Sequence, residues 1–361
     1  MALSRPERGG IVNAAFESVE HGSIRGFRWL KANPTPGWLG LAVAVAWPLV
    51  VAIVYSGAER AIGPVRLPFS STHFVWGTVV NSLLFGLIVG GEASLKQGVA
   101  EDLRRLRRIL PAGGQVPDSL ANDIANLSRT IRRLVTIIAL LGGVCVATLD
   151  PSLRDLYGHL SGFDPRYLLF VIQNVLFAVL GARLFATDVH MTRAYAHLGE
   201  RVKVDLLDPS PILSFGRKGL RSVILWVSIS TVFSMFWVLD SAGQANVSLA
   251  VAVLGLAIVA LIAPTRGVHR SIAAAKAREL AIVSQAIRLE RGTALSPRRA
   301  ESPPDDARLG NLIQYQAFVK SIREWPFDLS IVSRSSLFIL LGAGSWLGGA
   351  VVELLLNRLV D

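Results

Sequence analysis

The sequence predicts an all-α integral membrane protein with seven transmembrane helices, a cytoplasmic N-terminus, an outer C-terminus and cytoplasmic helical extensions. Of its 361 residues, 52% are hydrophobic and only 17% are charged, whereas roughly a quarter of a soluble chain is charged. Seven apolar stretches approach the roughly 17–25 residues that a spanning helix needs. They are Trp38–Tyr55, Phe74–Gly91, Leu134–Leu149, Tyr167–Phe185, Leu220–Leu239, Val247–Ala263 and Ser335–Leu356.

The distribution of basic residues predicts the orientation of these helices. Lysine and arginine gather before the first stretch and after the second, fourth and sixth, whereas Gly57–Thr72, Asp150–Arg166 and Asp240–Asn246 carry few of them. Because basic connections stay in the cytoplasm, the N-terminus is expected inside and the C-terminus outside. The same asymmetry accounts for the net charge of +11, so nucleic-acid binding is not expected. The arginine- and alanine-rich composition is typical of a bacterial inner-membrane protein.

The chain divides into four regions on this view. Residues 1–37 form an amphipathic cytoplasmic arm, residues 38–266 hold six spanning helices, residues 267–328 form a cytoplasmic helical region, and residues 329–361 hold the seventh span. Within the connections, apolar stripes and strong helix formers predict further helices. These helices are a single helix through Leu120–Leu134 into the third span, an extension through Asp188–Asp205, a helix over Ser271–Arg291, and a stripe of Leu312, Tyr315, Val319 and Ile322. Gly292–Asp306, rich in proline and charge, is expected to be an unstructured loop.

Polar groups inside the apolar stretches are few. The amide pair Gln173 and Asn174 is expected to make hydrogen bonds between helices. Cys145, the only cysteine, is expected to be a small buried hydrophobe and permits no intrachain disulfide. The histidines lack the spacing of a metal site, and no nucleotide-binding or hydrolase motif occurs, so neither a cofactor nor a bound metal nor enzyme activity is expected. An enzyme acting on lipid would have to use Glu92, Arg183, Asp188 and His190.

Small residues cluster on two spans. Gly86 and Gly90 form a GxxxG pattern in the second span, for which packing within the chain is the favoured explanation. The seventh span combines small residues with hydroxyl groups and one acid near its outer end. Its pore-lining candidates are Ser335, Gly342, Ser345, Gly349 and Glu353.

Two junctions interrupt the apolar pattern, where the sixth span leaves the membrane and where the seventh begins. At the first, Lys276 and Glu279 have the spacing of a helical ion pair. At the second, Pro326 interrupts the preceding helix and Asp328 is placed to cap the next one. Trp325 and Phe327 are explained equally well as anchors at the membrane surface. The hinge or coupling candidates are Pro264, Arg266, His269, Lys276, Glu279, Trp325, Pro326, Asp328 and Arg334.

The runs Pro264–Leu280 and Trp325–Glu353 resemble those of an uncharacterised family of bacterial multi-span membrane proteins, which implies no particular activity. In topology, most of the chain is similar to the insect odorant and gustatory receptor channels. Those channels have seven spans, an inner N-terminus, cytoplasmic helix extensions, and a last span broken into cytoplasmic and pore-lining parts. This likeness carries no shared motif, so no ligand-binding or gating residue is transferred from it.

The leading hypothesis is therefore a homo-oligomeric channel, with or without a gating ligand, whose last span lines a pore that Glu353 makes cation-selective. The alternative is a non-enzymatic signalling or scaffold protein that binds a soluble partner through its cytoplasmic helices. The clusters Arg104–Arg108 and Arg298–Arg299 would contact that partner, or would instead attract anionic lipid at the cytoplasmic face of the bilayer. The sequence identifies no small-molecule ligand.

Overall fold

The computed structural model describes residues 35–62, 71–106, 118–149, 165–208, 210–237, 255–294, 306–326 and 333, and every regular element in these ranges is helical. The α-helices are α2 (Pro36–Ile62), α3 (Ser71–Leu106), α4 (Asp118–Ala125), α5 (Arg129–Leu149), α7 (Pro165–Arg201), α8 (Leu213–Ser234), α10 (Arg266–Ala294) and α11 (Asp306–Ser321). Residues 255–262 are also helical. Short 3-10 turns are η3 (Ser210–Ile212), η4 (Met235–Trp237) and η5 (Ala263–Thr265). The all-α class is confirmed.

Four helical segments are long and apolar enough to cross a membrane: Pro36–Ala61, Phe74–Leu106, Asn122–Thr148 and Pro165–Arg201. They contain the first four predicted spans. A multi-pass membrane protein is therefore the class that the described residues fit. The number of seven spans and their orientation stay predictions.

The last three predicted spans differ in what the structure describes of them. Helix α8 covers most of the fifth but begins earlier, at Leu213, and its first turns carry Arg217, Lys218 and Arg221. It is therefore not among the segments apolar enough to cross a membrane. Only residues 255–263 of the sixth are described. The seventh, like the arm up to residue 34, lies outside the described residues.

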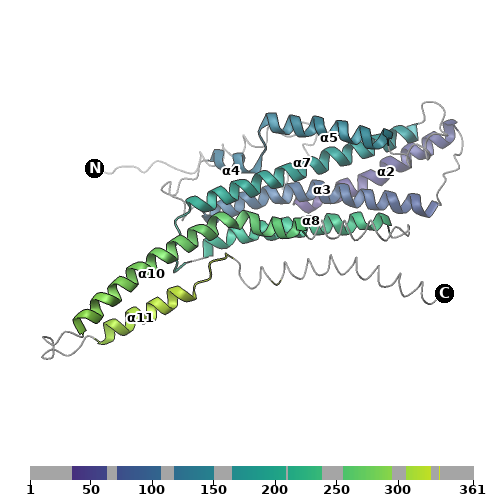
Figure 1. Cartoon of the computed structure of the whole chain (residues 1–361). Helices are drawn as coiled ribbons and strands as arrows, with labels where there is room; N and C mark the ends of the chain where they lie inside the picture. The colour runs from purple at the N-terminus through teal and green to yellow at the C-terminus, as the bar shows by residue number, and fades with distance from the viewer. Residues whose placement is uncertain are drawn as a thin grey trace, which may run out of the picture.

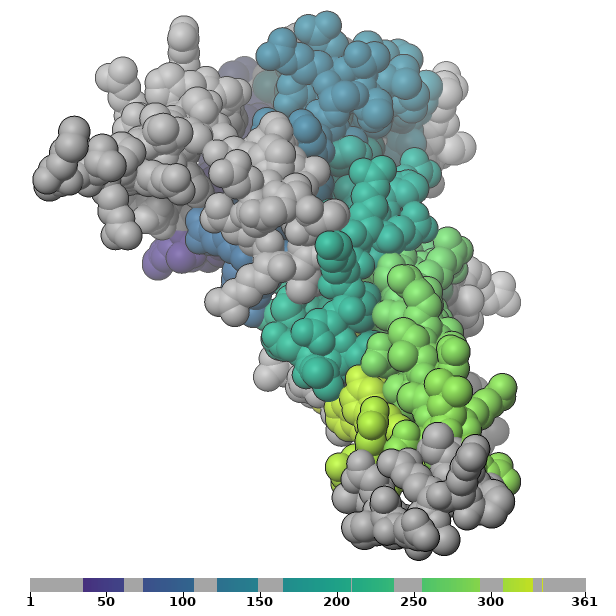
Figure 2. Space-filling model, turned by 90° about the vertical axis from the view of Figure 1, so that its left-hand side faces the viewer, coloured from purple at the N-terminus to yellow at the C-terminus, as the bar shows by residue number. Residues whose placement is uncertain are grey.

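Helices α2, α3, α5, α7 and α8 run side by side as a bundle, from one end of which α10 and α11 extend as a hairpin (Figure 1). The space-filling view shows this hairpin projecting away from the other described helices (Figure 2). Helix α3 packs against α2, α7 and α8, whereas α5 packs mainly against α7. Large apolar side chains therefore remain exposed on α2 and α5, among them Ile53 and Leu141, as expected of helices that face lipid.

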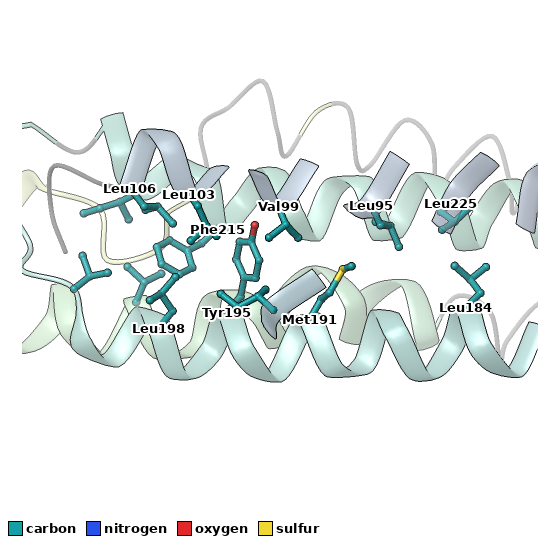
Figure 3. Close-up of a cluster of buried hydrophobic side chains, with 14 of the residues drawn as sticks. Leu95, Val99, Leu103, Leu106, Leu184, Met191, Tyr195, Leu198, Phe215 and Leu225 are labelled. Carbon is teal, nitrogen blue, oxygen red and sulfur yellow. The ribbon is translucent and has the colours of Figure 1, made fainter. Parts of the chain in front are cut away.

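The hydrophobic core lies where the C-terminal parts of α3 and α7 meet α8 (Figure 3). Leu95, Val99, Leu103 and Leu106 of α3 face Leu184, Met191, Tyr195 and Leu198 of α7, with Phe215 and Leu225 added by α8. In the close-up, the Tyr195 ring reaches from α7 towards α3. The core is thus concentrated at the end of the bundle from which the hairpin emerges.

Glycines let α2 and α3 approach closely. A Cβ placed on Gly86 would lie 2.7 Å from the Gly40 carbonyl oxygen and 2.9 Å from the Ala44 Cβ, and one on Gly90 would lie 3.1 Å from the Gly40 Cα. Helix backbones can meet at this distance only where side chains are absent. The explanation of Gly86 and Gly90 as packing within the chain is confirmed.

The predicted single helix through Leu120–Leu134 is wrong, because residues 126–128 separate α4 from α5. The Asn126 side chain turns back to the carbonyl and side-chain oxygens of Asn122, while the Ser128 hydroxyl accepts a hydrogen bond from the Ile131 N–H and caps α5. Asparagine and serine favour such local bonds over continuation of a helix.

Two further expectations about polar groups in the spans are also wrong. The Asn174 amide donates to the carbonyl of Phe170 in its own helix rather than to another helix. Cys145 is exposed on α5 instead of buried.

Replacing Gly86 with alanine is expected to destabilise the bundle by about 1–3 kcal/mol, because the added methyl group overlaps α2. Gly77→Ala is the matched control on the same helix, since no heavy atom lies within 4 Å of the added Cβ. That control should be neutral or stabilise by up to about 1 kcal/mol through helix propensity. Thermal unfolding in detergent measures both, and equal melting temperatures for the two variants would contradict the close approach.

Candidate functional site: buried ion pairs and the base of the hairpin

A buried lysine of α8 is paired with an aspartate of α7. The Lys218 side chain is 1% exposed and that of Asp188 is 6% exposed, and Lys218 Nζ lies 2.7 Å from Asp188 Oδ1. Lys218 also donates to the Ser222 hydroxyl at 2.7 Å, and Ser222 donates to Asp188 Oδ1 at the same distance. The Trp226 indole N–H donates to Asp188 Oδ2 at 2.8 Å. Both carboxylate oxygens are therefore satisfied.

One turn further along α8, Arg221 pairs with Asp102 of α3. Arg221 Nη1 lies 2.7 Å from Asp102 Oδ2 and Nη2 lies 3.4 Å from Oδ1, which is a two-point contact. The Tyr195 hydroxyl of α7 donates to the same Oδ2 at 3.1 Å. Both Asp102 and Tyr195 are fully buried. The second pair thus joins three helices, α3, α7 and α8.

Sequence spacing explains how α8 makes both pairs. Lys218, Arg221 and Ser222 recur at helical intervals of three and four, so they occupy neighbouring positions on one side of α8. Opposite them, α3 has glycine: a Cβ on Gly98 would overlap the Arg221 guanidinium. Gly91 leaves the same kind of space for Leu225. The arginine fits between the helices because the facing residue has no side chain.

The two pairs lie near the edge of the apolar part of the bundle. Asp188 is about 35 Å along α7 from its first residue, Pro165, at 1.5 Å per residue. The hydrocarbon core of a bilayer is about 30 Å thick. Charges buried at this level must be paired, because leaving either partner alone costs several kcal/mol. The pairs allow the polar first turns of α8 to stay inside the bundle.

The hairpin begins on a close crossing between α10 and α7. Cβ atoms on Gly267 and Gly199 would overlap the backbones of Ala196 and Val268, respectively. The Ser271 hydroxyl donates to the Gly199 carbonyl at 2.8 Å. Pro264, just before α10, is buried. The start of α10 is therefore fixed against α7 by direct backbone contact.

The end of α11 is held on α10 by polar and aromatic contacts. The His269 ring stacks on Trp325 with centroids 4.2 Å apart and an interplanar angle of 13°. His269 Nδ1 lies 3.0 Å from the Glu324 carbonyl oxygen. Lys276 Nζ donates to the Ile322 carbonyl at 2.9 Å and lies 3.5 Å from a Glu324 carboxylate oxygen. The structure thus brings together the two junctions that the sequence singles out.

Further along the hairpin, Glu279 accepts a hydrogen bond of 3.0 Å from the Tyr315 hydroxyl, and this bond raises the pKa of Tyr315 above its ordinary value. Gln316 donates to the Ser284 hydroxyl at 2.9 Å. The predicted helical ion pair between Lys276 and Glu279 is wrong, since both side chains reach across to the other helix or its end instead. The physical reason is that α11 offers each of them a partner of its own.

The remaining predicted residues divide into two groups. Arg266 is exposed at the start of α10, and Pro326 is buried at the end of the described hairpin. Asp328, Arg334 and the five pore-lining candidates, Ser335, Gly342, Ser345, Gly349 and Glu353, lie outside the described residues. The pore-lining assignment stays a prediction.

Three of the four polar residues considered for a lipid-active enzyme have separate partners. Glu92 pairs with Lys96 at 2.6 Å, Asp188 with Lys218, and His190 Nε2 lies 2.8 Å from the Asp123 carbonyl oxygen. Among the described residues, no group of three or more His, Cys, Asp or Glu side chains is placed to hold a metal ion.

Sequence reasoning missed Asp102, Tyr195, Lys218, Arg221 and Trp226 as members of one site. The basic residues at the start of α8 were attributed to a cytoplasmic connection and to orientation. The sequence does contain a signal for this site. Lys218 and Arg221 lie three residues apart at the start of an apolar helix, and two earlier helices carry Asp102 and Asp188 towards their C-terminal ends. Their pairing still could not be chosen, because two acids and several bases allow many combinations.

Comparisons with protein-family models, with curated proteins and with solved structures found no match.

Lys218→Met is expected to cost about 3–5 kcal/mol of unfolding free energy, because it leaves the Asp188 carboxylate buried without its cation. The double variant Lys218→Met/Asp188→Asn should cost less than the single variant, since it removes both charges. Arg270→Gln breaks an exposed pair with Glu200 and should cost no more than about 1 kcal/mol. Denaturation in detergent gives all three values, and a double variant as unstable as the single one would refute the pairing argument.

Proposed function

We propose that the chain is a homo-oligomeric membrane channel in which the α10–α11 hairpin controls a pore lined by the last apolar segment, Ser335–Leu356. The observation that supports this proposal is the set of contacts at the base of the hairpin. His269 and Lys276 hold residues 322–325 against α10, and the chain continues from there through Pro326 towards that segment.

The two helices of the hairpin differ in how firmly they are attached to the bundle. Helix α10 meets α7 through backbone contact at Gly199 and Gly267, which leaves no room for sliding. The end of α11 depends on a ring stack and a few polar contacts of side chains. A ligand or partner that acts on the hairpin would therefore displace α11 more readily than α10. Such a displacement would change the direction in which the chain leaves at Pro326, where the missing N–H interrupts helical bonding.

The chemistry of the last segment suits a pore for cations. Ser335, Gly342, Ser345 and Gly349 are small, so they leave space beside the helix, and Glu353 places a negative charge near one end. Rings of acidic side chains favour cations in channels. One such segment cannot enclose a pore, so the proposal requires several subunits around an axis.

Purified protein in planar bilayers is expected to conduct cations, and Glu353→Gln should lower the preference for cations over anions. A charge at 4 Å in water is worth about 1 kcal/mol, or about fivefold in local cation concentration. Lys276→Gln should change the open probability, whereas Arg278→Gln, an exposed position on the same helix, should not. No conductance over a range of voltages and solutes would refute the channel.

A second candidate function is binding of a soluble partner by the hairpin, as a scaffold or signalling protein would. The observation that favours it is apolar exposure on a part of the molecule that projects from the bundle. Ile282 is 62% exposed and Leu289 is 66% exposed on α10, and Ile313 and Phe318 are 50% and 46% exposed on α11. Large exposed apolar side chains on a projecting part of a protein are typical of interaction sites.

On this second proposal, cross-linking in native membranes should give one partner in fixed ratio to the chain, and Ile282→Asp should abolish the cross-link. Ala277→Asp introduces the same charge at another exposed position of α10 and should leave the cross-link intact. Equal loss with both variants would contradict binding through this surface, as would a purified homo-oligomer that contains no other protein.

A further inference from the structure

Three arginines begin α5 without any acid beside them. Arg129, Arg132 and Arg133 are all exposed, and intervals of three and four place them on neighbouring positions of one helix face. The first turn of α5 contains no acidic residue. The cluster is therefore a concentrated positive charge on the surface.

Four other basic residues of the bundle are paired with an acid within the chain. Lys218 pairs with Asp188, Arg221 with Asp102, Lys96 with Glu92 and Arg105 with Glu101. In the same described part of the chain, no salt bridge involves an arginine of the α5 cluster. The three arginines of the cluster differ from these four cations in this respect, so they are available to an external anion.

The position of the cluster on its helix also favours an anion. The N-terminal end of a helix carries a partial positive charge from its unbonded N–H groups, so cations there are unfavourable and anions are favourable. Placing three arginines at this end is destabilising unless something negative lies against them. An anion bound to the cluster would offset both the mutual repulsion of the arginines and their repulsion by the helix end.

The cluster lies at the end of the apolar part of the bundle, where the phosphates of a bilayer crossed by these helices would lie. Gly143 of α5 lies against Val175 and Ala178 of α7, and α4, just before α5, contacts His190 of α7 through the Asp123 carbonyl. The two helices are therefore antiparallel, and the start of α5 lies near the level of Asp188 and His190. This is also the level of the buried ion pairs, at the edge of the apolar region.

Apolar side chains continue along α5 directly beyond the arginines. Leu134 is 56% exposed, Ile137 is 58% exposed, Ile138 is 61% exposed and Leu141 is 59% exposed. An arginine cluster next to such a surface complements a phosphate joined to acyl chains rather than a free phosphate ion. We infer that Arg129, Arg132 and Arg133 form a binding site for the headgroup phosphate of an anionic phospholipid, whose chains lie along α5. The inference is independent of the channel proposal.

The test uses the full chain, purified and delipidated in a neutral detergent, with phosphatidylglycerol as the probe. Added phosphatidylglycerol should raise the melting temperature, whereas phosphatidylcholine and inorganic phosphate at the same concentration should not, because only a ligand that binds the folded state stabilises it. Native mass spectrometry should show retained phosphatidylglycerol. The variant R129Q/R132Q/R133Q should bind it about 100-fold more weakly, and R132Q alone about fivefold more weakly, on the usual contribution of each basic residue near an anionic surface.

The matched control is R278Q/R288Q/R291Q, which removes the same charge from exposed positions of α10 and should keep wild-type affinity. An equal loss of affinity for phosphatidylglycerol in the two triple variants would overturn the proposal, because the lipid would then be attracted by net charge and not by the α5 cluster. If inorganic phosphate raised the melting temperature as much as phosphatidylglycerol does, the ligand would be a free phosphate and the lipid proposal would be overturned. If R129Q/R132Q/R133Q does not accumulate, two measurements replace it: the affinity of R132Q for phosphatidylglycerol, and the stabilisation of wild-type protein by phosphatidylglycerol and by phosphatidylcholine. Equal stabilisation of wild-type protein by the two lipids overturns the proposal.

Discussion

The buried ion pairs of α8 constrain the arrangement of the other helices. Lys218, Asp188 and Asp102 are buried inside the bundle, whereas the Arg221 side chain is 25% exposed. Each buried charge is stabilised only while its partner on another helix lies beside it. Because the two aspartates belong to α3 and α7, helix α8 must lie against both and in one register. The polar first turns of α8 then stay within the bundle, and the chain that follows leads to η5 and α10 at the same end.

Glycines set the distances that these polar contacts require. Gly98 makes room for the Arg221 guanidinium, Gly40 and Gly86 bring α2 onto α3, and Gly199 and Gly267 bring α10 onto α7. Apolar packing alone is tolerant of small shifts along a helix, since one aliphatic side chain can replace another. The combination of charge pairs, which fix register, and glycines, which fix separation, gives the bundle a single arrangement of its helices.

The first four spans and the hairpin were predictable from the sequence because their signals are local. Apolar length marks a span, and strong helix formers with the stripe Leu312, Tyr315 and Val319 mark the two hairpin helices. The ion pairs were not predictable, because Asp102 and Arg221 are 119 residues apart and one sequence carries no record of which charges meet. The contact of His269 with Trp325 was missed for the same reason, although both residues stood out. The break at Ser128 was missed because the apolar stripe continues across it, while the capping hydroxyl decides the local structure.

The same contacts determine where a mechanical change at the hairpin can travel. Movement of α10 is resisted by its backbone contact with α7, and movement of α7 is resisted in turn by Asp188 and Tyr195, which hold it to α8 and α3. The end of α11 is attached differently, through side-chain contacts of Trp325 and Lys276. On the channel proposal, a force on the hairpin is expected to act first at residues 322–326, because only side-chain contacts hold them to α10.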